Sequence, residues 1–87
     1  MAYTINFRDD ARRVFLSLDP GVQKRIASVI DRLAENPRPG QATRLVGDPG
    51  TWRVRAGDWR VLYEIHDDRL MVLVIDVAHR SIVYRRH

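Results

Sequence analysis

The sequence predicts an α+β fold in which an N-terminal strand and a helical hairpin precede an antiparallel β-meander. Three observations predict this class. Apolar residues recur at helical spacing over residues 11–33, and from residue 52 they alternate with polar residues at the period of a strand. The length of 87 residues suits one domain, spanning 1–87, with a thin hydrophobic core.

The N-terminal strand is expected at residues 3–7, where β-forming side chains alternate. Asp9 and Asp10 follow, at positions where helix N-caps are favoured. Apolar side chains then recur at helical spacing to residue 18, which predicts a first helix.

A second helix is expected to begin at Asp19-Pro20, an N-cap residue followed by a proline at the first helical position. One apolar stripe runs along residues 22–33. The segment 36–40 contains two prolines, which cannot continue the helix. The link between the two helices is short, so they are expected to form a helical hairpin.

The meander is expected to begin after a turn at Gly47-Asp48-Pro49-Gly50. Strands at 52–56 and 59–65 flank Gly57-Asp58, a suitable tight hairpin turn. After a further turn at Asp67-Asp68, the nearly unbroken apolar run 70–77 predicts a central strand covered on both faces. Residues 82–84 are expected to add a short last strand.

The pairing of the hairpin strands predicts a cluster of arginines. Across Gly57-Asp58 the opposite residues are Ala56 and Trp59, Arg55 and Arg60, and Arg53 and Leu62. The core-facing side would carry Trp52, Val54, Val61 and Tyr63. Since side chains two apart share a face, the three arginines would lie together. Like charges opposite one another destabilise a ladder, so the cluster is a candidate anion-binding site. Alternatively, the arginines extend into water and bury only their stems.

The overall charge also favours an anionic partner. The net charge is +4, and of 15 basic residues only Lys24 is not arginine, whose planar fork matches pairs of phosphate oxygens. These features favour a polyanionic partner: a nucleic acid, a ribosome or an acidic protein. Alternatively, the many arginines reflect a codon bias. The chain contains no cysteine, no apolar run long enough to cross a membrane and no signal-peptide pattern, so a cytoplasmic location without a membrane partner is expected.

The C-terminus offers further candidates. His79 and Arg80 leave the end of the long strand, where functional side chains are often presented. Tyr84 could reach the same surface and Arg85 could bind phosphate. Alternatively, as is more common for such residues, Tyr84 is a core residue and Arg85 is part of a solvated tail. The three histidines show no metal-ligand spacing, so no metal site is expected.

Two stretches resemble the RelE family of bacterial toxins: WRVRAGDWRVLY at 52–63 and VAHRSIVY at 77–84. The likeness extends over essentially the whole chain, and the hairpin pattern is shared by the wider RelE/ParE superfamily. The resemblance implies a toxin of a type II toxin–antitoxin system. It also implies ribosome-dependent cleavage of messenger RNA in the A site, with no metal or other cofactor, by attack of a 2′-hydroxyl on the adjacent phosphate.

The resemblance also implies roles for individual residues. Arg53 and Arg55 match the family's RNA-binding basic pair, Arg60 the arginine that stabilises the reacting phosphate, and Arg80 the arginine at the leaving oxygen. Tyr84 matches the tyrosine that orients or deprotonates the attacking hydroxyl. These roles agree with the chemistry, because fixed guanidinium groups stabilise the negative charge that develops at phosphorus.

The chain departs from the family at its basic pair, which is usually lysine. Arginine does not lose its proton in proteins, so a general base is needed elsewhere. His79 is a candidate, because the ordinary pKa of a histidine is nearest neutral pH. Alternatively, His79 binds phosphate or caps the strand.

The resemblance implies partners as well. These are a RelB-like antitoxin, the ribosome with its messenger RNA, and operator DNA reached through the antitoxin. Two other functions remain open: a ParE-like toxin that binds DNA gyrase without nuclease activity, and an inactive module that binds only nucleic acid or antitoxin.

Overall fold

The computed structural model describes residues 2–81. They form two helices, five strands and one short 3₁₀ turn at Asp67–Arg69. The elements are β1 (Thr4–Phe7), α1 (Asp9–Leu16), α2 (Pro20–Glu35), β2 (Thr43–Leu45), β3 (Asp48–Ala56), β4 (Trp59–His66) and β5 (Met71–His79). Neither helix in this part of the chain is long and apolar enough to cross a membrane.

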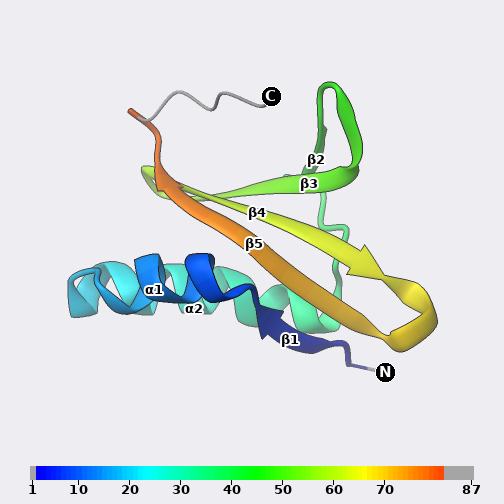
Figure 1. Cartoon of the computed structure of the whole chain (residues 1–87), viewed down its shortest axis with the longest axis horizontal. Helices are drawn as coiled ribbons and strands as arrows, with labels where there is room; N and C mark the ends of the chain where they lie inside the picture. Colours follow the sequence, from blue (N-terminus) through cyan, green and yellow to red (C-terminus); the bar gives the residue numbers. More distant parts are fainter. Residues whose placement is uncertain (1, 82–87) are drawn as a thin grey trace.

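The strands form one sheet in the order β1-β5-β4-β3-β2. β2 to β5 pair antiparallel, and β1 joins the edge parallel to β5, with Ile5 opposite Val72. Figure 1 shows α1 and α2 running along one face of the sheet, while β2 and β3 extend away from them. The predicted class, with a strand, a helical hairpin and an antiparallel meander, is confirmed.

The entry to the meander differs from the prediction. Residues 43–45 form β2, which sequence reasoning missed. The turn lies at Val46-Gly47, where Gly47 has a φ of +84°, a conformation that glycine adopts without strain. Residues 48–50 therefore begin β3 rather than forming the turn. The strand predicted at 82–84 lies outside the described residues.

The start of α1 is also corrected. The N-cap is Arg8, and Asp9 and Asp10 lie in the first helical turn. The carboxylate of Asp10 pairs with the guanidinium of Arg8 at 2.8 Å and accepts the backbone N–H of Ala11 at 2.9 Å. Negative charge in the first turn is favourable, because it faces the positive end of the helix dipole. The predicted start of α2 at Asp19-Pro20 is confirmed.

The core lies between the helices and one face of the sheet. Its buried residues are Ala11, Ile26, Ile30, Leu33, Val54, Ala56, Val61, Tyr63, Val72, Val74 and Val77. Trp52 packs against this cluster while half-buried, so the predicted core-facing side of the hairpin is confirmed. The hydroxyl of Tyr63 donates a hydrogen bond to the carbonyl of Pro37 at 2.7 Å, and burial raises the pKa of Tyr63 to about 12.

β5 lies between β1 and β4, as predicted for a central strand, but α1 and α2 cover only one of its faces. A bulge interrupts its pairing with β4: Tyr63 lies opposite Val74, Leu62 lies opposite Asp76, and Ile75 has no direct partner. Val74 and Ile75 are both buried, although only Val74 belongs to the helix-facing core. The bulge allows two consecutive apolar residues, Val74 and Ile75, to be buried together, although α1 and α2 cover one face only.

Candidate nucleic-acid interface

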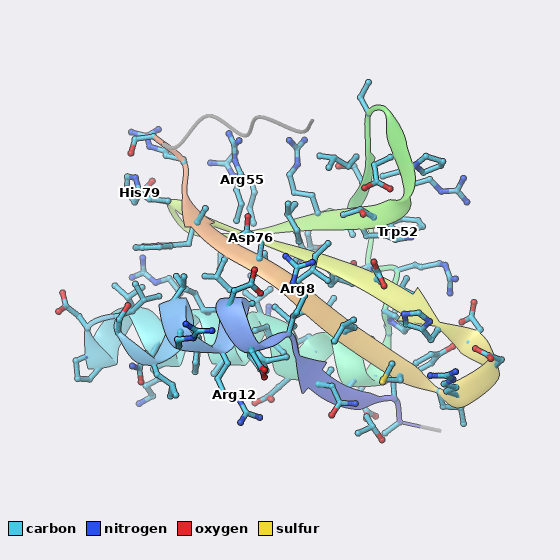
Figure 2. The ribbon with its side chains drawn as sticks, viewed as in Figure 1. Arg8, Arg12, Trp52, Arg55, Asp76 and His79 are labelled. Atoms are coloured by element: carbon cyan, nitrogen blue, oxygen red, sulfur yellow. The ribbon has the colours of Figure 1, made fainter. Side chains whose placement is uncertain are left out.

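Three arginines share the sheet face opposite the helices, and we call this group the arginine face: Arg53, Arg55 and Arg60. Arg55 lies directly opposite Arg60, and Arg53 lies opposite Leu62, which is the predicted register. Arg55 is exposed, and the other two are half-buried. In Figure 2 the side chain of Arg55 points away from α1 and α2. The strand pairing therefore concentrates three positive charges on one open surface.

Two carboxylates that sequence reasoning missed lie on the same side of the sheet. Glu64 is four residues beyond Arg60 on β4, and Asp76 is two residues before Ala78, the partner of Arg60 on β5. Both act on Arg8, whose pKa is raised mainly by its hydrogen bonds to Asp10, with smaller contributions from Asp76 and Glu64. The alternation of β4 alone could have placed Glu64 here. Because Glu64 and Asp76 would repel a polyanion, a bound polyanion is favoured on the part of this surface nearer β3.

His79 lies away from the arginine face. It is opposite Trp59, and the two rings meet edge-on, with their centroids 5.3 Å apart and an angle of 83° between their planes. Trp59 packs against the helix-facing core, whereas Arg60, the next residue, points to the other side. The register therefore separates His79 from Arg60.

The hydrogen bonds of His79 define its neutral form. Its Nδ1 accepts the backbone N–H of Ser81 at 3.2 Å and lies 2.9 Å from the hydroxyl oxygen of Ser81. A backbone N–H can only donate, so Nδ1 is unprotonated and the neutral ring carries its proton on Nε2.

Arg80 follows the last residue of β5 and is tied to the β3–β4 hairpin turn. Its backbone N–H donates to the carbonyl of Asp58 at 2.7 Å, and its Nε lies 3.5 Å from Asp58 Oδ1. Asp58 directly precedes the hairpin partner of Ala56, so Arg80 lies at the end of the hairpin that carries Arg55 and Arg60. Tyr84 and Arg85, the remaining predicted site residues, lie outside the described residues.

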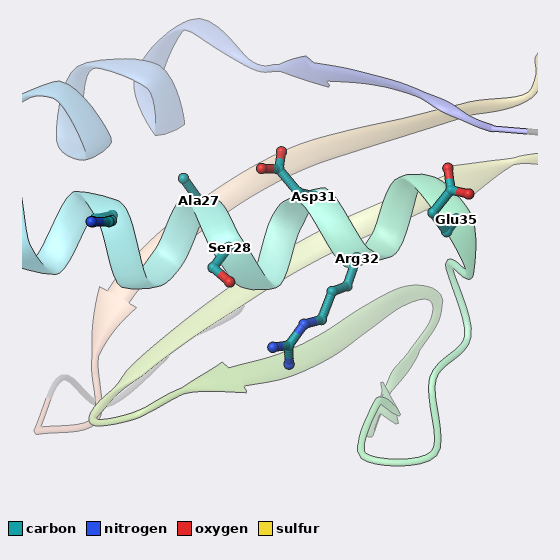
Figure 3. A pocket seen from close by; sticks show the side chains of 6 residues that line it. Ala27, Ser28, Asp31, Arg32 and Glu35 are labelled. Carbon is teal, nitrogen blue, oxygen red and sulfur yellow. The ribbon is translucent and has the colours of Figure 1, made fainter.

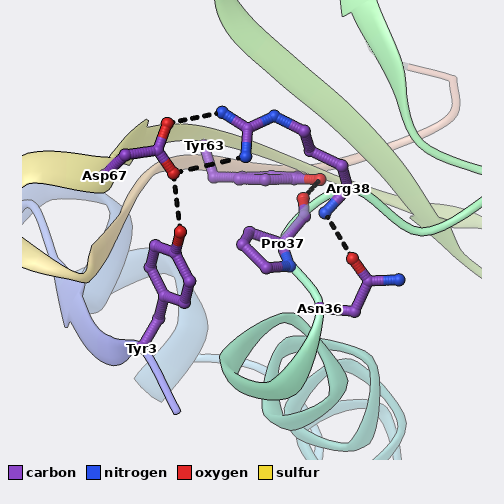
Figure 4. A network of polar contacts seen from close by, with 6 residues as sticks. All are labelled: Tyr3, Asn36, Pro37, Arg38, Tyr63 and Asp67. Atoms are coloured by element: carbon purple, nitrogen blue, oxygen red, sulfur yellow. Dashed lines mark hydrogen bonds and ion pairs between the residues drawn. The ribbon is translucent and has the colours of Figure 1, made fainter. Parts of the chain in front are cut away.

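A polar network lies at the opposite end of the sheet (Figure 4). The carboxylate of Asp67 binds the guanidinium of Arg38 through two contacts, of 2.7 and 3.3 Å, and accepts the hydroxyl of Tyr3 at 2.6 Å. Hydrogen bonding from Arg38, and then from Tyr3, lowers the pKa of Asp67. The guanidinium carbons of Arg38 and Arg44 lie 5.7 and 5.4 Å from the ring centre of Trp52. The contacts of Asp67 join the residue before β1, the 3₁₀ turn and the loop before β2.

One hollow of the described structure does not coincide with the arginine face. It is a groove along α2, and Figure 3 shows its lining residues, which carry charges of both signs: Lys24, Ala27, Ser28, Asp31, Arg32 and Glu35. Because α2 covers the other side of the sheet, this groove and the arginine face point in different directions. Among residues 2–81, no three His, Cys, Asp or Glu side chains gather as a group that could hold a metal ion.

This fold and its arginine face define a small basic α+β protein whose open sheet surface suits an anionic partner. The family described as the ParE toxin of the type II toxin–antitoxin system parDE matches residues 2–84. The chain therefore belongs to the RelE/ParE family and is a toxin of a toxin–antitoxin system.

Similar proteins carry RelE-type names. Toxin RelG of Mycobacterium tuberculosis is 35% identical over 92 residues, which cover 99% of this chain and all of that protein. The mRNA interferase toxin RelE of Escherichia coli is 28% identical over 93% of this chain and 86% of its own length. The toxin–antitoxin complex RelBE2 of M. tuberculosis contains a chain with a TM-score of 0.80 and 29% identity, covering 92% of this chain and 100% of that one.

Proposed function

We propose that this toxin is a ribosome-dependent endoribonuclease that cleaves messenger RNA. The observation that carries the proposal is the arginine face, where Arg55 and Arg60 lie opposite one another on an open sheet surface. The similarity to a relative named as an mRNA interferase supports the same activity. A pair of like charges that destabilises its own ladder is best explained by an anionic ligand.

In the proposed reaction the 2′-hydroxyl of a nucleotide attacks the adjacent phosphorus. A bond forms between phosphorus and the 2′-oxygen, the bond to the 5′-oxygen breaks, and the products are a cyclic phosphate and a free 5′-hydroxyl. The proton leaves the 2′-hydroxyl for a base, and a proton is delivered to the departing 5′-oxygen. Negative charge grows on the phosphate oxygens and on the leaving oxygen during this step, so groups that stabilise this charge lower the barrier.

Arginines supply that stabilisation in the proposal. Arg60 binds the reacting phosphate, with Arg55 and Arg53 holding the flanking phosphates and Arg80 at the leaving oxygen. Because their guanidinium groups stay charged, they need no proton transfer to act. The strands hold three of these side chains in register before substrate arrives, which reduces the reorganisation needed in the transition state.

The hydrogen bonds of His79 limit the part that this residue can take in the proton transfers. Its Nδ1 already accepts the N–H of Ser81, so we assign His79 as a hydrogen-bond donor through Nε2 rather than as the general base. Tyr84 is proposed to orient or deprotonate the attacking hydroxyl, and Arg85 to bind phosphate, on the resemblance of residues 77–84 to the family pattern alone.

A RelB-like antitoxin is the proposed partner that holds the toxin inactive. The solved relative is a toxin–antitoxin complex, and an acidic or amphipathic antitoxin segment would be attracted to the net charge of +4. By covering the arginine face, such a segment would exclude RNA. Operator DNA would then be reached through the antitoxin.

Gyrase inhibition is the second candidate, because the matching family is described as ParE toxin. The two functions separate experimentally. Purified toxin is added to ribosomes stalled on a defined message, and the cuts are mapped by primer extension. The same preparation is tested against DNA gyrase in a supercoiling assay. Cuts within the A-site codon support the nuclease, whereas intact message with loss of supercoiling supports the gyrase toxin.

Arg60→Ala is the decisive variant for the nuclease. We expect it to lower the cleavage rate by roughly 100-fold or more, the usual effect of removing one fixed charge-stabilising group. Arg69→Ala is the matched control, since Arg69 is an exposed arginine in the 3₁₀ turn whose contact with Asp68 is 4.0 Å long. Equal activity of the two variants would contradict the site assignment.

A further inference from the structure

The turn of the β3–β4 hairpin holds the first residue beyond β5. Asp58 makes two contacts to Arg80: its backbone carbonyl accepts the N–H of Arg80 at 2.7 Å, and its carboxylate lies 3.5 Å from Nε. Within residues 2–81, Asp58 supplies the only ion pair to Arg80. Backbone and side chain of Arg80 are therefore both directed by one residue of the turn.

The turn itself has a left-handed glycine and lies beside a side chain of α2. Gly57 has a φ of +64°, and a Cβ at this position would lie 2.9 Å from Nη1 and 3.2 Å from Cδ of Arg25, which belongs to α2. The end of the exposed Arg25 side chain therefore lies close to the turn, which leaves no room for a side chain at residue 57 unless Arg25 moves.

The contact is poorly suited to a purely stabilising role. The side chains of Asp58 and Arg80 are 63% and 61% exposed, and exposed ion pairs contribute little to stability because water and salt screen them. The contact does suit orientation. The carboxylate engages the Nε edge of the guanidinium, which leaves the fork of the two Nη groups able to bind phosphate oxygens in pairs.

We infer that Asp58 is a positioning residue that aims the guanidinium of Arg80 at the leaving oxygen of the substrate; this inference rests on the proposed nuclease function. The carboxylate does not touch substrate in this arrangement. It restricts the rotation of a long side chain, so that the Nη fork of Arg80 is in place when the phosphate arrives. Sub-ångström placement of such groups has large effects on rate.

The test measures single-turnover cleavage of ribosome-bound message by Asp58→Asn, Asp58→Ala and Asp58→Glu. We expect the first two to reduce the rate roughly 10-fold or more, with the concentration of programmed ribosomes needed for half-maximal rate unchanged. Asp58→Glu should recover part of the rate, because it restores a carboxylate near Nε. Asp68→Asn is the control, an exposed acid whose contact with Arg69 is 4.0 Å, and it should cleave like wild type.

A double-mutant comparison separates positioning from general destabilisation. In an Arg80→Ala background, Asp58→Asn should cause no further loss, because the residue it positions is gone. Equal losses in both backgrounds, or wild-type activity in Asp58→Asn, would overturn the inference.

A readout independent of cleavage distinguishes this failure from failure of the proposed function. The Nε–H resonance of Arg80, observed by ¹⁵N NMR, should shift and lose its order in Asp58→Asn but not in Asp68→Asn. If the Arg80 resonance changes in Asp58→Asn but the wild-type protein does not cleave message, the nuclease proposal fails. Asp58 then only anchors the side chain of Arg80. If the resonance is unchanged, Asp58 does not position Arg80.

Discussion

Arg55 and Arg60 lie directly opposite one another across the β3–β4 hairpin, on the face of the sheet that the helices leave open. Two guanidinium groups in this relationship repel each other and weaken the ladder that carries them. The hydrophobic core on the other face, which includes Val54 and Val61, holds the strands together regardless. The hairpin thus combines a stable inner face with an outer face arranged for an anion.

Relieving this repulsion should stabilise the fold while harming function. We expect Arg55→Thr to raise the free energy of unfolding by roughly 0.5 kcal/mol at low ionic strength, since it removes one like charge and introduces a good strand former. The gain should shrink in 0.5 M salt, which screens exposed charges. Urea denaturation at both salt concentrations measures the effect.

Arg53→Thr is the matched control for that experiment, because Arg53 lies on the same strand and the same face but opposite Leu62. The Arg53→Thr variant gains the same strand-forming threonine but keeps both arginines of the opposed pair, Arg55 and Arg60. An equal, salt-dependent gain in Arg53→Thr would mean that general charge reduction, and not the pair of Arg55 with Arg60, accounts for the change.

The hairpin turn depends on glycine at residue 57. Gly57→Ala should lower the free energy of unfolding by about 1–2 kcal/mol, because a φ of +64° is strained for an L-residue with a Cβ. Adding Arg25→Ala should leave most of this loss in place, since the contacting end of Arg25 can move aside but φ cannot. Thermal and urea unfolding of the single and double variants measure the two contributions.

Gly21→Ala provides the comparison for the turn variant. Gly21 lies in the first turn of α2, and a Cβ there would meet nothing within 4 Å. The same substitution should be neutral or stabilising by up to about 1 kcal/mol, because alanine is the better helix former. A loss of stability at Gly21 as large as that at Gly57 would refute the assignment to backbone strain.

The pKa of Asp67 should respond to removal of its guanidinium partner. In Arg38→Ala the pKa of Asp67 should rise toward its ordinary value of 3.8, with part of the lowering retained through the hydroxyl of Tyr3. In wild type the lowered pKa contributes stability above pH 3.8, which is lost as the pH falls through the folded-state pKa. Carboxyl ¹³C NMR titration measures the shift, and Arg69→Ala should leave it unchanged.

The buried hydroxyl of Tyr63 predicts an alkaline limit to stability. The pKa of Tyr63 is raised from 10.0 to about 12. The stabilisation that its protonated hydroxyl contributes is therefore fully present below pH 10 and is lost as the pH rises through 12. Across this range wild type should lose about 2–3 kcal/mol relative to Tyr63→Phe. At pH 7 the variant should be less stable by about 1 kcal/mol, because the carbonyl of Pro37 loses its donor. Parallel pH profiles of the two proteins would contradict this origin.

Local patterns were sufficient to predict the hairpin and its arginines. A two-residue turn between alternating strands defines which residues are opposite, so Arg55 and Arg60 were paired correctly without a structure. The same logic did not find β2, because a three-residue strand carries too little alternation to be recognised. It also predicted the wrong N-cap at Asp9 and Asp10. The helical backbone begins at Asp9, so the extended residue before it, Arg8, is the N-cap.

The sequence by itself determined the order of the elements, the register of the central hairpin and the excess of positive charge, because each depends on neighbouring residues. Only the tertiary structure decided the side of the sheet on which His79 lies, the approach of Asp76 and Glu64 to Arg8, and the attachment of Arg80 to Asp58. The physical reason is that the bulge in β5, and the path of the chain beyond the end of β5, depend on contacts between segments that are far apart in the sequence. Such contacts depend on packing in three dimensions and leave no periodic trace in the chain.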